Sequence, residues 1–336
     1  MVKNKRYIII PTYKEAENLR ELLPILRKYN VIIVDDNSQD GTEEICRKFR
    51  NVKLIIREKK LGLASAVLTG IRSIREKDAS VVVTDADFEH DYNSIGRMFD
   101  LLSRYDFVEG VKKGKRLPSR GLISRLGTVF VKTLVPESKW LKDPMSGFFG
   151  FRLKSVNVER IKPIGYKIML EVFMNLKKGS KKTHFPYPYG YRKHGKSKLS
   201  LLVMLQFVWQ VLRLNNYRLA LFLSIGIFGI FFNEFLLYEF YFFMPLIYAL
   251  VYAIVISTLV NFLMNHYITF KARSPFSSSL AKFIGVTAAS GVINLVVAYS
   301  LSLFMLYLLA NFVGILIAFL FKYVFSEGYV WRTDNH

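Results

Sequence analysis

The stretch VVVTDADFEHD, residues 81–91, runs from an apolar segment directly into four acidic side chains. An apolar run of this length predicts a buried strand. The acids that follow it are Asp85, Asp87, Glu89 and Asp91. They therefore lie at the carboxyl end of the strand, where open α/β sheets bind their ligands. The spacing alone fits either a metal or phosphate site or a solvated turn, and both interpretations stay open at this point.

Three earlier segments repeat the pattern of an apolar run that ends in polar residues. They are RYIIIPTY at 6–13, NVIIVDDNS at 30–38 and VKLIIRE at 52–58. Helical patterns such as that of residues 15–29 separate them, and this alternation predicts a parallel α/β sheet. The polar ends of the strands should meet at one edge of the sheet, which predicts a nucleotide site. The chain has no G-x-G-x-x-G and no P-loop, so a dehydrogenase or an ATPase has no support.

The composition divides the chain into two environments. Of its 336 residues, 51% are hydrophobic, yet the net charge is +22 and the mean hydropathy is +0.23. The single cysteine, Cys46, excludes a disulfide framework within the chain and a cysteine zinc cluster. The first residues contain only a short apolar stretch, so we expect this end to stay in the cytoplasm. No nucleic-acid-binding module is recognisable, and lipid phosphate is the anion that we expect the positive charge to meet.

The last third of the chain predicts an all-α transmembrane domain over 219–336. Its four apolar stretches are each about long enough to cross a bilayer, and they lie at 219–238, 243–265, 281–304 and 307–326. Lysine and arginine residues precede the first stretch, separate the second from the third and follow the fourth, whereas the other two connections have neither. The positive-inside rule therefore predicts a multi-pass protein with both termini and the catalytic domain in the cytoplasm. Polar residues at or near membrane depth, such as His266 and Lys322, fit interhelical contacts or a functional path.

Two amphipathic segments connect the soluble half with the membrane half. Residues 117–136 gather Leu126, Val129 and other apolar side chains on one helical face, and residues 198–218 do the same with Val208 and Trp209. Both segments fit helices that lie in a membrane interface, and both also fit ordinary core packing. We therefore predict an interfacial helix or linker at 201–218.

Five motifs in the soluble half carry a family resemblance. They are PTYKEAEN at 11–18, VDDNSQDGT at 34–42, DADFEH at 85–90, DPMSGFFGF at 143–151 and GYKIMLE at 165–171. Together they resemble family 2 glycosyltransferases of GT-A fold, and most closely the dolichol-phosphate mannose synthases. The resemblance implies a Rossmann-like α/β catalytic domain in the cytoplasm over 1–200. It also implies transfer of mannose from GDP-mannose to dolichyl or polyprenyl phosphate, with inversion at the anomeric carbon. The last 115 residues resemble the GtrA-like four-helix membrane family.

The same resemblance implies the site residues. A Mg²⁺ or Mn²⁺ ion that holds the diphosphate would be bound by Asp85, Asp87 and Glu89. The nucleotide would be surrounded by Pro11, Tyr13, Glu15, Asp36, Asp85 and Ala86. The acceptor phosphate would be held by Lys112, Arg125, Arg192 and Lys198. The residues expected to be catalytic are Asp85, Asp87, Arg125 and Arg192. Glu89 stands where the family commonly has Gln, and Lys112 stands where it usually has Arg.

Two other functions remain as alternatives to mannose transfer. A polyprenyl-phosphate glucosyltransferase that uses UDP-glucose would share the fold and the membrane helices. A lipid-linked sugar translocator would have no use for the acidic cluster, which makes it the weaker alternative. A processive polysaccharide synthase is disfavoured because the chain lacks a Q-x-x-R-W motif.

Overall fold

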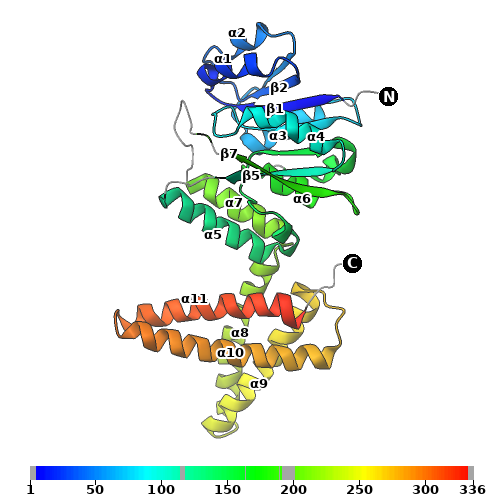
Figure 1. Ribbon diagram of the computed structural model, residues 1–336. Helices are drawn as coiled ribbons and strands as arrows, with labels where there is room; N and C mark the ends of the chain where they lie inside the picture. Colours follow the sequence, from blue (N-terminus) through cyan, green and yellow to red (C-terminus); the bar gives the residue numbers. More distant parts are fainter. Residues whose placement is uncertain (1–4, 114–117, 163, 189, 191–200, 332–336) are drawn as a thin grey trace. The chain divides into compact units, whose positions relative to one another are not determined.

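The computed structural model describes residues 5–113, 118–162, 164–188, 190 and 201–331 (Figure 1). The chain divides into two compact units, Met1–Leu214 and Asn215–His336. The first unit contains the α/β sheet and the second contains four long apolar helices, as the sequence predicts.

The first unit is built on a seven-stranded sheet in the order β3-β2-β1-β4-β6-β5-β7. Among the strands that the structure describes, only β6 is antiparallel to its neighbours, β4 and β5. The remaining pairs are parallel, so β1, β2, β4 and β5 all end at the same edge of the sheet. The strands are β1 (Arg6–Thr12), β2 (Asn30–Asp35), β3 (Val52–Ile56), β4 (Ser80–Val83), β5 (Phe107–Lys113), β6 (Phe149–Arg152) and β7 (Lys182–Pro188).

Helices cover both faces of this sheet. On one face, α1 (Ala16–Ile25), α2 (Thr42–Arg47) and α4 (Ile95–Leu102) pack against a continuous apolar core that includes Ile8, Ile10 and Val82. On the other face lies α3 (Leu63–Arg72), which comes so close to β1 that a Cβ on Gly70 would be 2.7 Å from Ile9. The first unit also contains α5 (Pro118–Leu134), α6 (Ile168–Met174) and α7 (Leu201–Leu214). The segment 201–214 therefore groups with the catalytic sheet as a helix.

The second unit consists of two helical hairpins. They are formed by α8 (Arg218–Tyr241) with α9 (Leu246–Met264) and by α10 (Phe276–Ser302) with α11 (Tyr307–Phe325). All four helices are long and apolar enough to cross a membrane, so the protein is a membrane protein. The predicted spans are correct in number, and their bounds differ from those of the helices by a few residues. α10 begins right after Pro275, five residues before the predicted start, and its first turn is rich in serine, whereas α9 begins at Leu246, three residues after the predicted start.

Both hairpins end in the same unusual way, because α9 and α11 continue into π-helical turns at Asn265–Thr269 and Ser326–Val330. Buried polar contacts gather at these turns. Arg218 and Asn215 contact Oε1 of Glu327 at 3.3 and 3.2 Å, and the indole Nε1–H of Trp331 donates to Nδ1 of His266 at 3.0 Å. π-helical turns are rare and concentrate at functional positions. Here they aim polar side chains at partners inside the unit.

Candidate active site at the carboxyl edge of the sheet

The sheet topology brings the predicted nucleotide and metal residues together. β1 ends before Tyr13, β2 before Asp36 and β4 before Asp85, and these three strands are adjacent and parallel. Lys112 lies near the end of β5, at the same edge. Residues from four different strands therefore converge on one side of the sheet, where open α/β folds bind ligands.

The two acids that follow β2 have different roles. Asp35 is buried and satisfied locally, since it accepts hydrogen bonds from Oγ1 of Thr12 at 2.9 Å and from the N–H of Ser38 at 2.8 Å. Asp36 instead forms a buried ion pair with Arg57 and accepts from the N–H of Gly62 at 2.9 Å. Asp35 thus shapes the turn, whereas Asp36 is the acid directed across the edge toward the segment after β3.

Arg57 is a site residue that the motifs did not reveal. It is buried, and besides its pairing with Asp36 it donates to Oγ of Ser65 at 2.5 Å and to the carbonyl of Gly62 at 2.9 Å. Gly62 has φ of +93°, a conformation that favours glycine, which lets the chain turn around the guanidinium group. The sequence could have indicated Arg57 through its position, because it follows β3 directly, at the same sheet edge as Asp36 after β2.

The aromatic ring of Tyr13 lies beside two cations. Nζ of Lys60 is 4.1 Å from the ring centroid and Nζ of Lys14 is 5.8 Å away. Glu15, two residues on, precedes α1 and accepts from the side chain of Asn18 at 2.6 Å. This corner therefore combines an aromatic face, cations and a carboxylate at the edge where β1 ends.

The acidic cluster follows the fully buried strand β4. Burial, followed by repulsion from Asp87, raises the pKa of Asp85 to about 7, while Lys167 and Lys112 act in the opposite direction. Asp87 is buried and accepts from the N–H of Glu89 at 3.2 Å. Two carboxylates held in mutual repulsion gain from a cation bound between them.

The residue set fits a divalent cation that also binds phosphate. Within the described ranges, no three His, Cys, Asp or Glu side chains converge closely enough to hold a metal by themselves. Mg²⁺ and Mn²⁺ that bind nucleotides need only one or two carboxylates, because phosphate oxygens and water complete the coordination. Asp85 and Asp87 meet that requirement, and Glu89 is a further carboxylate two residues along the chain.

His90 supports Asp85 from behind. Its Nδ1 accepts from the backbone N–H of Asp85 at 3.3 Å, and Nε2 lies 4.0 Å from Oδ2 of the same residue. The ring stacks on Phe148 with centroids 5.3 Å apart. Burial lowers the pKa of His90 well below its usual value, so the ring is neutral, with its proton on Nε2 facing the carboxylate.

Asp91, the fourth acid of the run, is structural. Its carboxylate accepts from the N–H of Asn93 at 3.1 Å and from the hydroxyl of Ser94, which caps the turn before α4. The cluster therefore separates into Asp85, Asp87 and Glu89, of which the last two raise the pKa of the first by repulsion, and Asp91, which caps the next helical turn.

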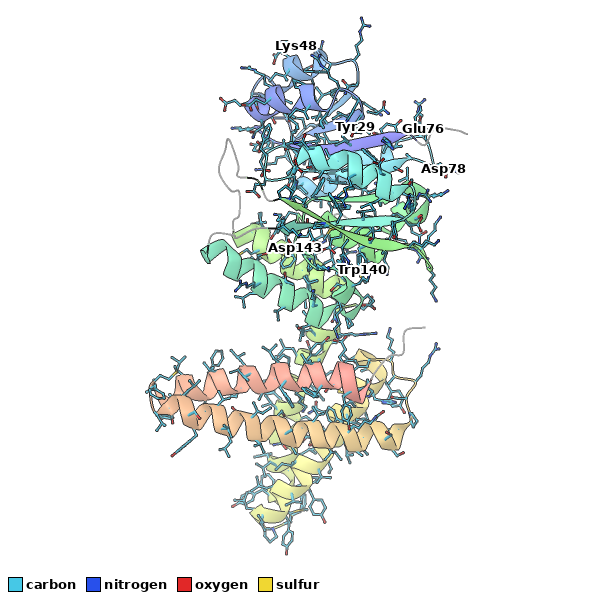
Figure 2. The ribbon with its side chains drawn as sticks, viewed as in Figure 1. Tyr29, Lys48, Glu76, Asp78, Trp140 and Asp143 are labelled. Carbon is cyan, nitrogen blue, oxygen red and sulfur yellow. The ribbon has the colours of Figure 1, made fainter. Side chains whose placement is uncertain are left out.

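The segment 143–148 closes the site beside Asp85. Glu109, fully buried on β5, accepts from the backbone N–H groups of Lys142 and Asp143 at 2.9 and 2.6 Å. A Cβ on Gly147 would lie 2.8 Å from Oδ2 of Asp85. Figure 2 labels Asp143 on this side of the sheet and Glu76 and Asp78, which precede β4, on the other. The DPMSG motif is thus a wall of the site, anchored by an acid that the sequence analysis missed.

Glu109 also contacts the aromatic layer beneath the wall. Its Oε2 lies 3.2 Å from Nε2 of His184, whose ring stacks on Trp140 at a centroid distance of 4.0 Å. Burial raises the pKa of Glu109 to about 7, although the two backbone N–H groups act against it. The segment 143–148 is therefore held by the buried carboxylate of Glu109, which contacts two backbone N–H groups and His184.

The predicted acceptor cations have different positions. Lys112 is half-buried at the end of β5, and Arg125 is exposed on α5. Arg192 and Lys198 lie outside the described residues. Exposed apolar side chains surround Arg125 on α5 and line one side of α7: Leu126, Val129, Leu202, Met204, Leu205, Val208 and Trp209. These two surfaces have the composition of interfacial helices.

Comparisons with known proteins agree with this architecture. Residues 7–155 match the model of glycosyl transferase family 2, and residues 221–331 match the GtrA/DPMS transmembrane domain. A dolichol-phosphate mannosyltransferase from Pyrococcus furiosus is 34% identical over 97% of this chain and 99% of its own length. One from Saccharomyces cerevisiae is 32% identical over 63% of this chain and 87% of its own.

Among solved structures, glucosyl-3-phosphoglycerate synthase from Mycobacterium tuberculosis, in complex with Mg²⁺ and UDP, shares the fold of the catalytic unit. It has a TM-score of 0.52 at 14% identity, and the match covers 63% of this chain and 80% of that one. The α/β sheet contains the family 2 match, and the four apolar helices coincide with the transmembrane match. This chain belongs to the dolichol-phosphate mannosyltransferases, and it combines a family 2 glycosyltransferase domain of GT-A fold with a GtrA/DPMS transmembrane domain.

Proposed function

We propose that this protein transfers mannose from GDP-mannose to the phosphate of dolichyl or another polyprenyl phosphate, inverting the anomeric carbon and releasing GDP. The observation that carries the proposal is the 34% identity to a dolichol-phosphate mannosyltransferase over nearly the whole of both chains. A match that extends through the acidic edge and the membrane helices supports the same donor and acceptor classes, and not merely the same fold.

The donor binds at the ends of β1, β2 and β4. Pro11 of β1, with Tyr13 and Glu15 after it, contacts the guanosine together with the groups after β2 and β4, namely Asp36, Asp85 and Ala86. Asp85 and Asp87, with Glu89 beside them, would hold a Mg²⁺ or Mn²⁺ ion at the diphosphate end of the donor, where it would supply positive charge to the leaving diphosphate. The neutral ring of His90 contacts both the backbone N–H and the carboxylate of Asp85, and these contacts keep the carboxylate in the site.

The acceptor needs cations and no general base. A lipid monophosphate is already largely ionised near neutral pH, so positioning and charge stabilisation carry the reaction. A phosphate oxygen forms the new bond to the anomeric carbon, and the bond from that carbon to the GDP oxygen breaks, with its electron pair leaving on GDP. Lys112 and Arg125 hold the acceptor phosphate, with Arg192 and Lys198 from the segment outside the described residues.

The lipid substrate calls for a defined topology. Arg213 precedes α8 and Arg218 is its first residue. Lys271 and Arg273 lie between α9 and α10, and Lys282 lies in the second turn of α10, whereas the α8–α9 and α10–α11 connections have no Lys or Arg. The positive-inside rule supports a cytoplasmic catalytic unit with both termini on the same side. The exposed apolar faces of α5 and α7 support contact with the headgroup region, where a lipid phosphate is accessible without leaving the bilayer.

The deciding experiment supplies purified full-length protein with a polyprenyl phosphate, Mg²⁺ or Mn²⁺, and radiolabelled GDP-mannose or UDP-glucose in separate reactions. We expect label in the lipid product only from GDP-mannose, and none when EDTA is present. Label from UDP-glucose alone would identify the alternative glucosyltransferase. Failure to label lipid from either donor, in protein that binds preformed sugar lipid, would favour a translocator.

A further inference from the structure

Lys167 is the last residue before α6, and its ammonium group reaches the wall of the active site. Nζ donates a hydrogen bond to the carbonyl oxygen of Met145 at 2.5 Å. Two residues further on, a Cβ on Gly147 would lie 2.8 Å from Oδ2 of Asp85. Lys167 therefore brings a positive charge to the part of the sheet edge where phosphate groups have to be held.

The backbone of Lys167 is held by α7. Nε2 of Gln210 donates to the carbonyl of Lys167 at 3.1 Å and to Oε1 of Glu171 at 3.2 Å. Arg213, one turn later on α7, forms an ion pair with Glu171 and donates to the carbonyl of Lys162 at 3.2 Å. Gln210 and Glu171 are fully buried, so these contacts fix α6 against α7.

The opposite side of α7 is apolar and exposed. Leu205 and Trp209 are 58% and 53% exposed, while Phe207, Gln210 and Val211 between and after them are buried. One helix thus presents an apolar face outward and, through Gln210, holds the backbone of Lys167 on its inner side.

We propose that Lys167 binds a phosphate oxygen of the reactants, and that Gln210 and Arg213 are positioning residues that tie this cation to the membrane-facing helix α7. The proposal rests on the proposed function. The ligand chemistry is a phosphate anion, which is present both in the donor diphosphate and in the lipid monophosphate. An ammonium group suits either as a point charge.

The first test compares the full-length wild type in detergent with Lys167→Met, Lys167→Arg and the control Lys162→Met, which removes an exposed lysine five residues earlier. The measurements are GDP affinity with Mn²⁺, the KM for a short polyprenyl phosphate, kcat and the melting temperature. We expect Lys167→Met to lower kcat/KM by about tenfold to a hundredfold, with partial rescue by Lys167→Arg. Weaker GDP binding would identify the donor diphosphate as the ligand, and a higher lipid KM with normal GDP binding would identify the acceptor.

A second test addresses the positioning role. Gln210→Ala should impair the same parameter as Lys167→Met, and the double variant should be no worse than Lys167→Met alone, because both act through one cation. Gln206→Ala, an exposed glutamine on the same helix, is the control. If Gln210→Ala does not fold, Arg213→Lys provides the same comparison with the charge retained.

The proposal is wrong if Lys167→Met matches the wild type within about twofold in all binding and kinetic parameters, or loses only thermal stability. Fully additive losses in the double variant would refute the positioning role. Failure of the proposed function would be distinguishable, because the wild type itself would then not turn over GDP-mannose. In that case we would compare the affinities of the wild type and Lys167→Met for GDP and for UDP. That comparison would decide whether Lys167 binds phosphate.

Discussion

Replacing Asp87 by asparagine should separate the chemistry of the acidic cluster from its structural role. The amide keeps an oxygen that can accept the N–H of Glu89, a contact of 3.2 Å, and it is close in size to the carboxylate. It loses the negative charge that repels Asp85 and that would bind the cation. We therefore expect activity to fall while the fold stays intact.

The expected magnitude follows from the charges involved. A charged contact of this kind is worth about 1.5–3 kcal/mol, so loss of the contact with the cation should lower kcat/KM by more than about tenfold and up to about a hundredfold or more. In EDTA the melting temperature should be unchanged or higher, because the repulsion between Asp87 and Asp85 is removed. The assay is transfer of radiolabelled mannose at saturating Mg²⁺ or Mn²⁺, combined with thermal unfolding in EDTA.

Asp91→Asn is the matched control. It removes the same charge four residues away, but asparagine caps a helix about as well as aspartate, so both activity and stability should stay near those of the wild type. The reasoning fails if Asp87→Asn retains activity within about tenfold at saturating metal, or if it destabilises the metal-free protein. It also fails if Asp91→Asn is equally inactive.

Three further outcomes are expected. Arg125→Ala should lower the efficiency with lipid phosphate by about tenfold to a hundredfold and leave GDP affinity unchanged, with Lys rescuing only in part; normal use of lipid would make Arg125 an interface charge. Gly147→Ala should reduce both GDP–Mn²⁺ affinity and turnover by about tenfold, because its Cβ would displace the Asp85 carboxylate 2.8 Å away; wild-type affinity would show that the wall can yield. Glu109→Gln should flatten the pH dependence of thermal stability. The pKa of Glu109 is raised by burial to about 7 in the folded protein, so the wild type loses stability as the pH rises from about 4.5 to about 7, whereas glutamine does not titrate. Equal slopes for the two proteins over that range would contradict this assignment.

The strands of the sheet and the membrane-spanning helices were predictable because each is formed by one continuous apolar segment of the sequence. Val81–Val83 form a buried strand and α8 to α11 are long apolar runs, so hydrophobicity alone reveals them. The acids after β4 were predictable because they follow this apolar run directly in the sequence. The continuation of the last turns into π-helix was not, since it depends on partners such as Glu327 and Arg218, which are far apart in the chain.

The supporting residues of the site were not predictable because their meaning comes from long-range contacts. Arg57 became informative only when the sheet brought it to Asp36, and Glu109 only when the chain returned at Lys142 and Asp143. Lys167 stood inside a recognised motif, yet its position depends on Gln210, 43 residues later. No local pattern encodes such pairs.

The single antiparallel strand has a consequence for how the chain is made. β6 lies between β4 and β5, so until Phe149–Arg152 has been synthesised the β3-β2-β1-β4 half has an open edge at β4. An unpaired edge strand is a template for aggregation. A nascent chain arrested before residue 149 should therefore bind chaperones and be protease-sensitive, and one arrested after β7, at residue 188, should be protected before α8 begins to be made.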